Sequence, residues 1–182
     1  MLNPYLAYDG LRLLEQEVPP AETLERILAG DPDAENRQVG IVDKYGRTAV
    51  WTGSETIDWS GHTEGRHFSV QGNRLAGPQV LKQVVQVMQN SEHLDLAERF
   101  MLALQAGAAA GGDKEGERSA NILVFAVEEY PLCDIRIDDH DNAMRELQRL
   151  FGLYREELLP IVRDLPKRED ILRPIKSGAL AP

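Results

Sequence analysis

Pairs of helix-like segments alternate with strand-like segments along this chain, and this order constrains its fold more than any other feature of the sequence. Apolar residues recur at helical spacing in two segments before Gly30, and strand-like segments follow between Arg37 and Gln71. Two more amphipathic helices are predicted after Gly77-Pro78, followed by two strands and a long C-terminal helix. Antiparallel hairpins with segregated helix pairs are typical of the α+β class, most simply a sheet covered by helices.

The first helix is predicted from four apolar residues at helical spacing: Ala7, Leu11, Leu14 and Val18. Pro19-Pro20 ends this helix and begins the second, because proline is tolerated at a first helical position. Segments 37–43 and 47–52 are predicted to pair as an antiparallel hairpin, since Gly46 in the short connection can adopt a positive φ.

The next predicted elements are a short edge strand over 56–59, a loop over 61–65 and a strand over 67–71. The apolar run 122–127 is expected to be a central strand covered on both faces. A strand over 134–138 and a helix capped by Asp141 or Asn142 should follow. With 182 residues, the chain suits one domain, expected over 1–165, and a loosely held tail over 166–182.

Composition excludes several partners. Acidic residues outnumber basic residues, 30 to 20, and the formal net charge is −10. Nucleic acid and anionic membrane surfaces are therefore poor partners. The single cysteine, Cys133, fits a reducing compartment, no apolar run can span a membrane, and the first residues lack signal-peptide features. We expect a cytoplasmic protein with no nucleic-acid or membrane partner.

Asp138-Asp139-His140-Asp141 is the densest cluster of metal-ligating residue types. Adjacent residues on a strand point to opposite faces, so the four cannot all converge. Acidic residues also favour a helix N-terminus. We therefore expect no metal and no cofactor, and a metal-dependent hydrolase using Asp138, Asp139 and His140 is kept as an alternative.

Two further motifs could bind a ligand. Gln71-Gly72-Asn73 ends a predicted strand, where amide side chains and a glycine could form an oxyanion or amide clamp, or else a turn that closes the strand. Gly111-Gly112-Asp113 and Ser119 precede the apolar strand and could line a pocket, but they lack the Lys-Ser/Thr of a P-loop. Ser60 and His62 are not secured as a nucleophile and base by their spacing alone.

The order of the motifs resembles the domain-of-unknown-function family 1028, over nearly the whole chain to about Leu150. The motifs that carry this resemblance are Asn3-Pro4, Arg37 to Asp43, Trp59-x-Gly61-His62, Gln71-Gly72-Asn73, Gly77-Pro78, Gly111-Gly112-Asp113, Ser119-Ala120 and Asp138-Asp139-His140. The resemblance implies an αββα sandwich of the N-terminal nucleophile hydrolase type, and amide-bond hydrolysis. In that chemistry the first residue of the mature chain, a Thr, Ser or Cys, is the nucleophile, and its α-amine is the base.

The resemblance also implies site residues. Asn73 and Asp113 are the candidate catalytic residues, Asn73 as a ligand of the oxyanion or substrate amide and Asp113 as an orienting carboxylate. The candidate substrate-binding residues are Gln71, Gly72, Ser119 and His62.

The chain departs from the family at its start. Members carry roughly four dozen residues before the Asn-Pro helix, which would form the first two strands and supply the nucleophile. This sequence begins Met1-Leu2, so we expect a truncated reading frame or a short form without those strands. Because missing strands leave apolar sheet surface bare, an uncovered edge or face is expected near residues 122–127.

The resulting hypothesis is an amidohydrolase-like protein for a small polar or amide ligand, with its nucleophile absent from the chain as given. The alternative is a non-catalytic ligand-binding or scaffold protein that retains the fold. The wide apolar stripe after Gly77 and the incomplete sheet predict a homo-oligomer, most simply a two-fold dimer.

Overall fold

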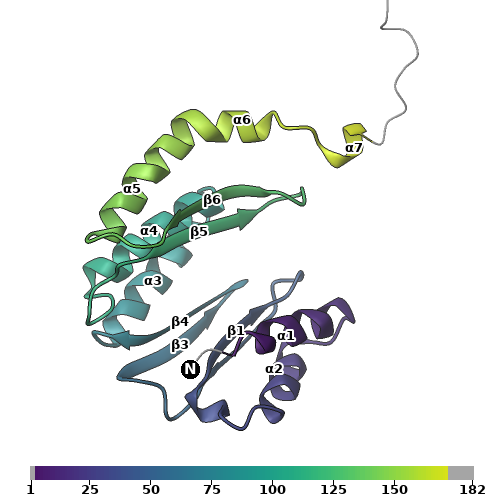
Figure 1. Cartoon of the computed structure of the whole chain (residues 1–182), viewed down its shortest axis with the longest axis vertical. Helices are drawn as coiled ribbons and strands as arrows, with labels where there is room; N and C mark the ends of the chain where they lie inside the picture. Colours follow the sequence, from purple (N-terminus) through teal and green to yellow (C-terminus); the bar gives the residue numbers. More distant parts are fainter. Residues whose placement is uncertain (1–2, 172–182) are drawn as a thin grey trace, which may run out of the picture. The chain divides into compact units, whose positions relative to one another are not determined.

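Residues 3–171 are described in the computed structural model, and they form two compact units that divide between Glu117 and Arg118. Both units combine helices with a small antiparallel sheet or sheets (Figure 1), so the predicted α+β class is confirmed. Most of the predicted tail, residues 172–182, lies outside the described residues.

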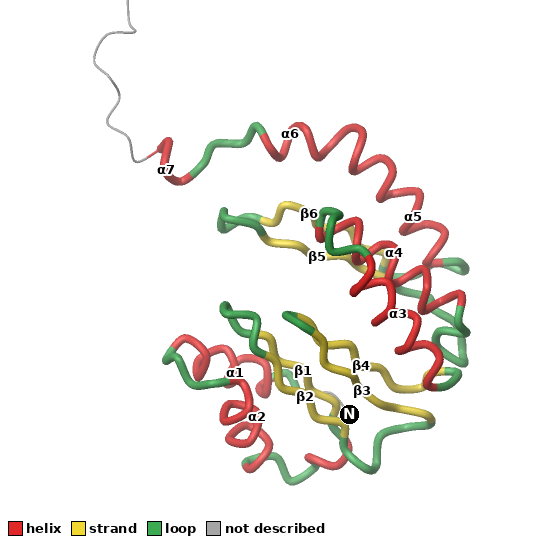
Figure 2. The backbone as a smooth tube through the Cα atoms, turned by 180° about the vertical axis from the view of Figure 1, so that it is seen from behind, coloured by secondary structure: helices red, strands yellow, loops and turns green. Residues whose placement is uncertain are grey.

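Unit 1 contains two helix pairs and two hairpins. Its elements are α1 (Tyr5–Glu15), α2 (Pro20–Ala29), the short 3-10 turn η1 (Ala34–Asn36), β1 (Gln38–Val42), β2 (Thr48–Thr52), β3 (Trp59–Gly65), β4 (Phe68–Leu75), α3 (Pro78–Asn90) and α4 (Leu96–Ala109). β1 pairs antiparallel with β2, and β3 with β4; Figure 2 shows them as two pairs of yellow strands. The predicted turn at Gly46 is confirmed, since its φ is +76°.

Side-chain alternation along β1 and β2 gives the hairpin two different faces. Ile41 and Ala49 point to the helix side and join a core with Leu6, Leu24 and Ile27. Gln38 and Thr52 point to the opposite side, where they meet β3 and β4. The far face of β4 carries Phe68 and Val70, as predicted, and packs on α3 and α4 through Met88 and Ala103. Unit 1 is thus ordered helix pair, hairpin, hairpin, helix pair.

Unit 2 is one hairpin with a helical segment on one face. Its elements are β5 (Ala120–Phe125), β6 (Pro131–Ile137), α5 (Ala143–Leu153), the π-helical turn η2 (Tyr154–Leu158), α6 (Leu159–Arg163) and α7 (Arg168–Ile171). Ile122 and Val124 are buried on the face that carries α5, whereas Leu123 and Phe125 are 46% and 54% exposed. Within unit 2 the strand is thus covered on one face only, unlike the expectation of cover on both faces, and the apolar face expected near residues 122–127 is uncovered in that unit. Asn142 caps α5 by accepting from the backbone N–H of Arg145, one of the two caps predicted.

Two other predictions are wrong. Residues 56–58 form no strand, and the predicted loop 61–65 lies within β3. A Cβ at Gly65 would overlap the Phe68 ring, so glycine here permits close packing within a strand and does not mark a loop. In α1 the predicted stripe is rotated: Leu6 and Gly10 face α2, while Ala7 and Leu11 are exposed.

Candidate functional site

A polar network joins the two hairpins of unit 1, and Gln38 is at its centre. The Gln38 Nε2 group lies 3.1 Å from the Gly61 carbonyl oxygen, 3.0 Å from the Gly72 carbonyl oxygen and 3.0 Å from Thr52 Oγ1. Backbone carbonyls only accept hydrogen bonds, so the nitrogen of Gln38 must face them. Gln38 Oε1 then points the other way.

Asn73 is held by that oxygen. Asn73 Nδ2 donates to Gln38 Oε1 over 3.1 Å. The orientation of Gln38 therefore fixes that of Asn73, because only the nitrogen of Asn73 can donate. One N–H and the carbonyl oxygen of the exposed Asn73 side chain have no partner among residues 3–171, and together they are the complement of an amide group.

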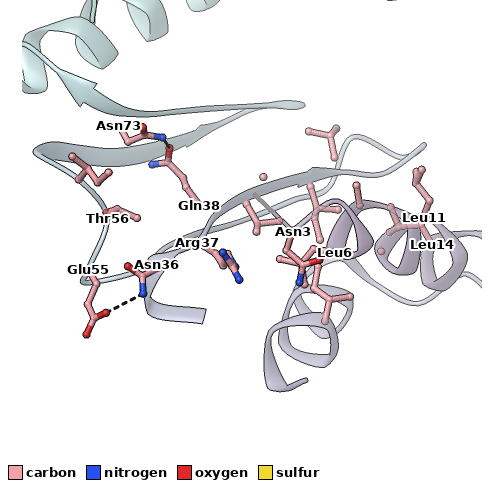
Figure 3. A pocket seen from close by; sticks show the side chains of 18 residues that line it. Asn3, Leu6, Leu11, Leu14, Asn36, Arg37, Gln38, Glu55, Thr56 and Asn73 are labelled. Carbon is pink, nitrogen blue, oxygen red and sulfur yellow. Dashed lines mark hydrogen bonds between the residues drawn. The ribbon is translucent and has the colours of Figure 1, made fainter. Parts of the chain in front are cut away.

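An open groove of about 680 Å³ lies between α1 and β1 and ends at Asn73 (Figure 3). Its apolar part is formed by α1 residues that include Leu11 and Leu14, and by residues 39–42 of β1. Its polar end includes Asn36, Arg37, Gln38, Glu55, Thr56 and Asn73. Ala7 and Leu11 are exposed because both line this open groove.

A buried ion pair fixes the groove at its polar end. Arg37 Nε donates to Asp31 Oδ2 over 2.8 Å, and Asn3 Nδ2 donates to the same oxygen over 3.0 Å. The hydrogen bonds from Arg37, then Asn3, then the backbone N–H of Asp33 lower the pKa of Asp31 far below its usual range. The guanidinium of Arg37 is neutralised by Asp31 and Asp33. Its role is therefore to stabilise the structure at this end of the groove.

Several predicted site residues lie close to this network. The Gly72 carbonyl is part of it, and His62 Nδ1 lies 2.9 Å from Thr52 Oγ1. The Gln71 side chain fills the space over Gly40, where a Cβ would overlap it. The pair of Ser60 and His62 is divided, since Ser60 bonds Thr56 and His62 bonds Thr52.

Asp113 and Ser119 make no described hydrogen bond to this network. Asp113 forms an isolated bridge with Leu75, and its Oδ1 accepts from the backbone N–H of Glu115. Ser119 is exposed in unit 2, directly before β5.

The acidic side chains of residues 138–141, in unit 2, form ion pairs with arginines. Arg118 pairs with Asp139 and Asp141, and Arg136 pairs with Asp138. His140 Nδ1 accepts from the backbone N–H of Asn142. Within residues 3–171 no group of three His, Cys, Asp or Glu side chains is placed to hold a metal ion. In the same part of the chain no helix is long and apolar enough to cross a membrane.

Gln38 is the site residue that the sequence analysis missed. The signal available was its place on β1, on the same face as Gly40 and on the opposite face from Val39 and Ile41. A polar side chain on the non-helical face of a half-buried strand needs partners, but the sequence does not say where these are.

Comparison with known proteins gives a family but no activity. Residues 1–147 match a family of unknown function, DUF1028, and the chain belongs to this family. No curated protein matches the sequence. The fold is similar to a crystal structure of a protein from Silicibacter pomeroyi of the same family, with 25% identity and a TM-score of 0.81. The match covers 92% of this chain and 75% of that chain.

Proposed function

We propose that this chain binds an amide at Asn73 and belongs to the amidohydrolases of the N-terminal nucleophile type. The observation that carries the proposal is the orientation of Asn73, which leaves one donor and one acceptor free at the end of a groove. An amide ligand offers the matching acceptor and donor, whereas a carboxylate offers acceptors alone. The order of layers in unit 1, with two hairpins between helix pairs, also favours this class.

Asn73 acts in this proposal as the substrate-amide ligand, and Gln38 positions it. Of the two roles expected for Asn73, we propose binding of the substrate amide and not of the oxyanion. One of the two N–H groups of Asn73 already donates to Gln38, which leaves one N–H and the carbonyl oxygen for the ligand. Asp113 and Ser119 stay predictions as an orienting carboxylate and a hydrogen-bond donor. The nucleophile of this class is the N-terminal residue of the mature chain.

The test compares two ligands that differ in one group, N-acetylglutamine and N-acetylglutamate, by NMR titration of the full chain. We expect the carboxamide to bind about tenfold more tightly, the effect of one or two hydrogen bonds. Asn73→Ala should abolish this preference. The matched control is Asn90→Ala, another exposed asparagine, which does not line the groove.

Equal affinity for the two ligands, or an unchanged preference in Asn73→Ala, would overturn amide recognition. Ammonia release from N-acetylglutamine, in addition to binding, would support a hydrolase over the non-catalytic alternative.

A further inference from the structure

Residues 112–114 pair with the end of β4, directly after Asn73. Three contacts form this pairing: an antiparallel bridge between Leu75 and Asp113, a hydrogen bond of 2.9 Å from the backbone N–H of Lys114 to the carbonyl of Arg74, and one of 3.0 Å from the backbone N–H of Ala76 to the carbonyl of Gly112. All of these residues belong to unit 1. The loop that follows α4 thus holds the backbone of the residue that comes next after Asn73.

Asn73 and Arg74 form a β-bulge, because the two lie opposite the single residue Ser60 in the β3–β4 ladder. The φ of Arg74 is +58°, a conformation that is uncommon for a residue with a Cβ. A bulge of this kind changes the direction of a side chain relative to that in a regular strand. The direction of Asn73 toward Gln38 therefore depends on Arg74 keeping this strained conformation.

Asp113 sets the shape of the turn over residues 113–116. Its Oδ1 accepts from the backbone N–H of Glu115 over 2.8 Å, and its carbonyl accepts from the backbone N–H of Gly116 over 3.0 Å. Gly116 has a φ of +86°, which its lack of a Cβ permits. An aspartate that bonds the backbone two residues later stabilises a turn of this type. The turn fixes the direction of the Lys114 N–H, which donates to Arg74.

Two ion pairs join the same turn to the second hairpin. Arg74 pairs with Glu115, and Lys114 Nζ lies 3.5 Å from Oδ1 of Asp58, directly before β3. The four side chains are between 37% and 71% exposed, and ion pairs at such positions contribute little stability. The backbone contacts of the turn therefore support Arg74 more than these ion pairs do.

We propose that Asp113 is a positioning residue for Asn73 and that it acts through the backbone of Arg74. Asp113 shapes the turn, the turn holds Arg74 in its strained conformation, and the bulge directs Asn73 to Gln38. The inference rests on the proposed function, because Asn73 is the amide ligand there. It assigns Asp113 a role that needs the acceptor oxygen of its side chain, but neither its charge nor a contact with the ligand.

The test compares two substitutions of Asp113. Asp113→Ala removes the acceptor of the Glu115 N–H, whereas Asp113→Asn keeps Oδ1 as an acceptor and removes the charge. In NMR titrations of the full chain, Asp113→Ala should reduce the preference for N-acetylglutamine over N-acetylglutamate from about tenfold to about twofold or less. Asp113→Asn should keep that preference within about twofold of the parent value.

Asp43 provides a matched control in the turn between β1 and β2. Its turn has the sequence Asp-Lys-Tyr-Gly, which matches the Asp-Lys-Glu-Gly of residues 113–116. Asp43 Oδ1 accepts from the backbone N–H of Tyr45 over 2.9 Å, and the Asp43 carbonyl accepts from that of Gly46 over 2.9 Å. This turn follows β1 at the end away from Gln38. Asp43→Ala should therefore lower the midpoint of urea unfolding, but it should leave the ligand preference within about twofold of the parent value.

The side chain of Asn73 can be observed without any ligand. Its NH2 resonances, assigned by their absence in Asn73→Ala, report the hydrogen bond to Gln38. They should move in Asp113→Ala, because the bulge no longer directs Asn73 to Gln38. They should stay in place in Asp113→Asn and in Asp43→Ala.

The outcomes distinguish failure of this inference from failure of the proposed function. Unchanged Asn73 resonances in Asp113→Ala would overturn the positioning role, whether or not an amide binds. An equal loss of the ligand preference in Asp113→Asn would also overturn it, since the charge would then be the deciding property. An equal loss in Asp43→Ala would overturn it as well, because general destabilisation would explain the effect. If the resonances move in Asp113→Ala but the parent binds both ligands equally, amide recognition is wrong and the positioning of Asn73 stands.

Discussion

Asn73 and Gln38 come from different hairpins, and a hydrogen bond of 3.1 Å from Asn73 Nδ2 to Gln38 Oε1 joins them. Gln38 is itself held by the carbonyls of Gly61 and Gly72. The orientation of the exposed asparagine is thus set by a half-buried glutamine 35 residues earlier in the chain.

Gln38→Met should uncouple this arrangement. The methionine fills a similar volume but cannot donate to the two partly buried carbonyls, and leaving acceptors unpaired there costs about 1–3 kcal/mol. We expect a loss of stability in that range by urea unfolding, together with a loss of the preference for N-acetylglutamine. Gln71→Met is the control, and it should change stability by less than about 0.5 kcal/mol, because Gln71 donates to no backbone carbonyl of β1 or β2 among the described bonds. An unchanged preference in Gln38→Met would show that Asn73 is oriented by other groups.

The ion pair of Asp31 and Arg37 should make the stability of unit 1 depend on pH. The folded pKa of Asp31 is lowered, chiefly by Arg37, so its contribution is fully present above the unfolded pKa of about 3.9. This contribution is lost as pH falls below that value toward the folded pKa. The midpoint of urea unfolding should therefore drop between pH 5 and pH 2.

Asp31→Asn should be less stable than the parent at pH 7 and should show a flatter dependence on pH below about 4, since the lowered pKa is removed. Asp33→Asn is the control, because the Asp33 side chain is 62% exposed and its ion pair with Arg37 lies at the protein surface. A parallel decline of the parent and Asp31→Asn with falling pH would contradict this prediction.

Gly53 should not tolerate a side chain. A Cβ there would overlap the backbone carbonyl of Glu35, which cannot swing aside as a side chain can. We expect Gly53→Ala to cost about 1–3 kcal/mol in urea unfolding, as for other overpacked sites. Gly30→Ala has no atom within 4 Å of the added Cβ, and it should change stability by less than about 0.5 kcal/mol. Equal stability of the two variants would show that the loop at Glu35 yields at little cost.

The sequence predicts those elements whose signals are local. The hairpin at Gly46 needs only a short connection and a residue that accepts a positive φ, and the helix α2 begins and ends at Pro20 and Gly30 as expected. β3 was missed because Gly61 and Gly65 resemble loop residues. A Cβ at these glycines would meet the Trp59 and Phe68 rings, only two and three residues away, but this contact depends on the conformation of the hairpin and not on the residue types alone.

The candidate site was predictable in part for the same reason. Gln71, Gly72 and Asn73 stand out as a cluster in the sequence, and the first hairpin is recognisable. Gln38 joins the two only because the hairpins stack, which brings Gly61 and Gly72 to it from 23 and 34 residues away. The exposed face of α1 was mispredicted for the same reason. Leu11 has the helical spacing of a core residue, but it lines a groove. The homo-oligomer, the amidohydrolase activity and the cytoplasmic location stay predictions.

Cys133 should be unreactive in the folded protein. Cys133 is 1% exposed, and burial raises the pKa of its thiol to about 11. At about pH 8 the thiolate required for alkylation or disulfide exchange is therefore scarce and shielded. Ellman's reagent should label the native chain far more slowly than the chain in denaturant. Leu123→Cys in a Cys133→Ala background is the control, since position 123 is on the exposed face of the same strand pair, and it should react at once. Because the folded pKa is raised, stability should also fall as pH rises from about 8.5 toward 11, and Cys133→Ala should remove that part of the decline. Rapid labelling of native Cys133 would mean that the β5–β6 hairpin opens readily from α5.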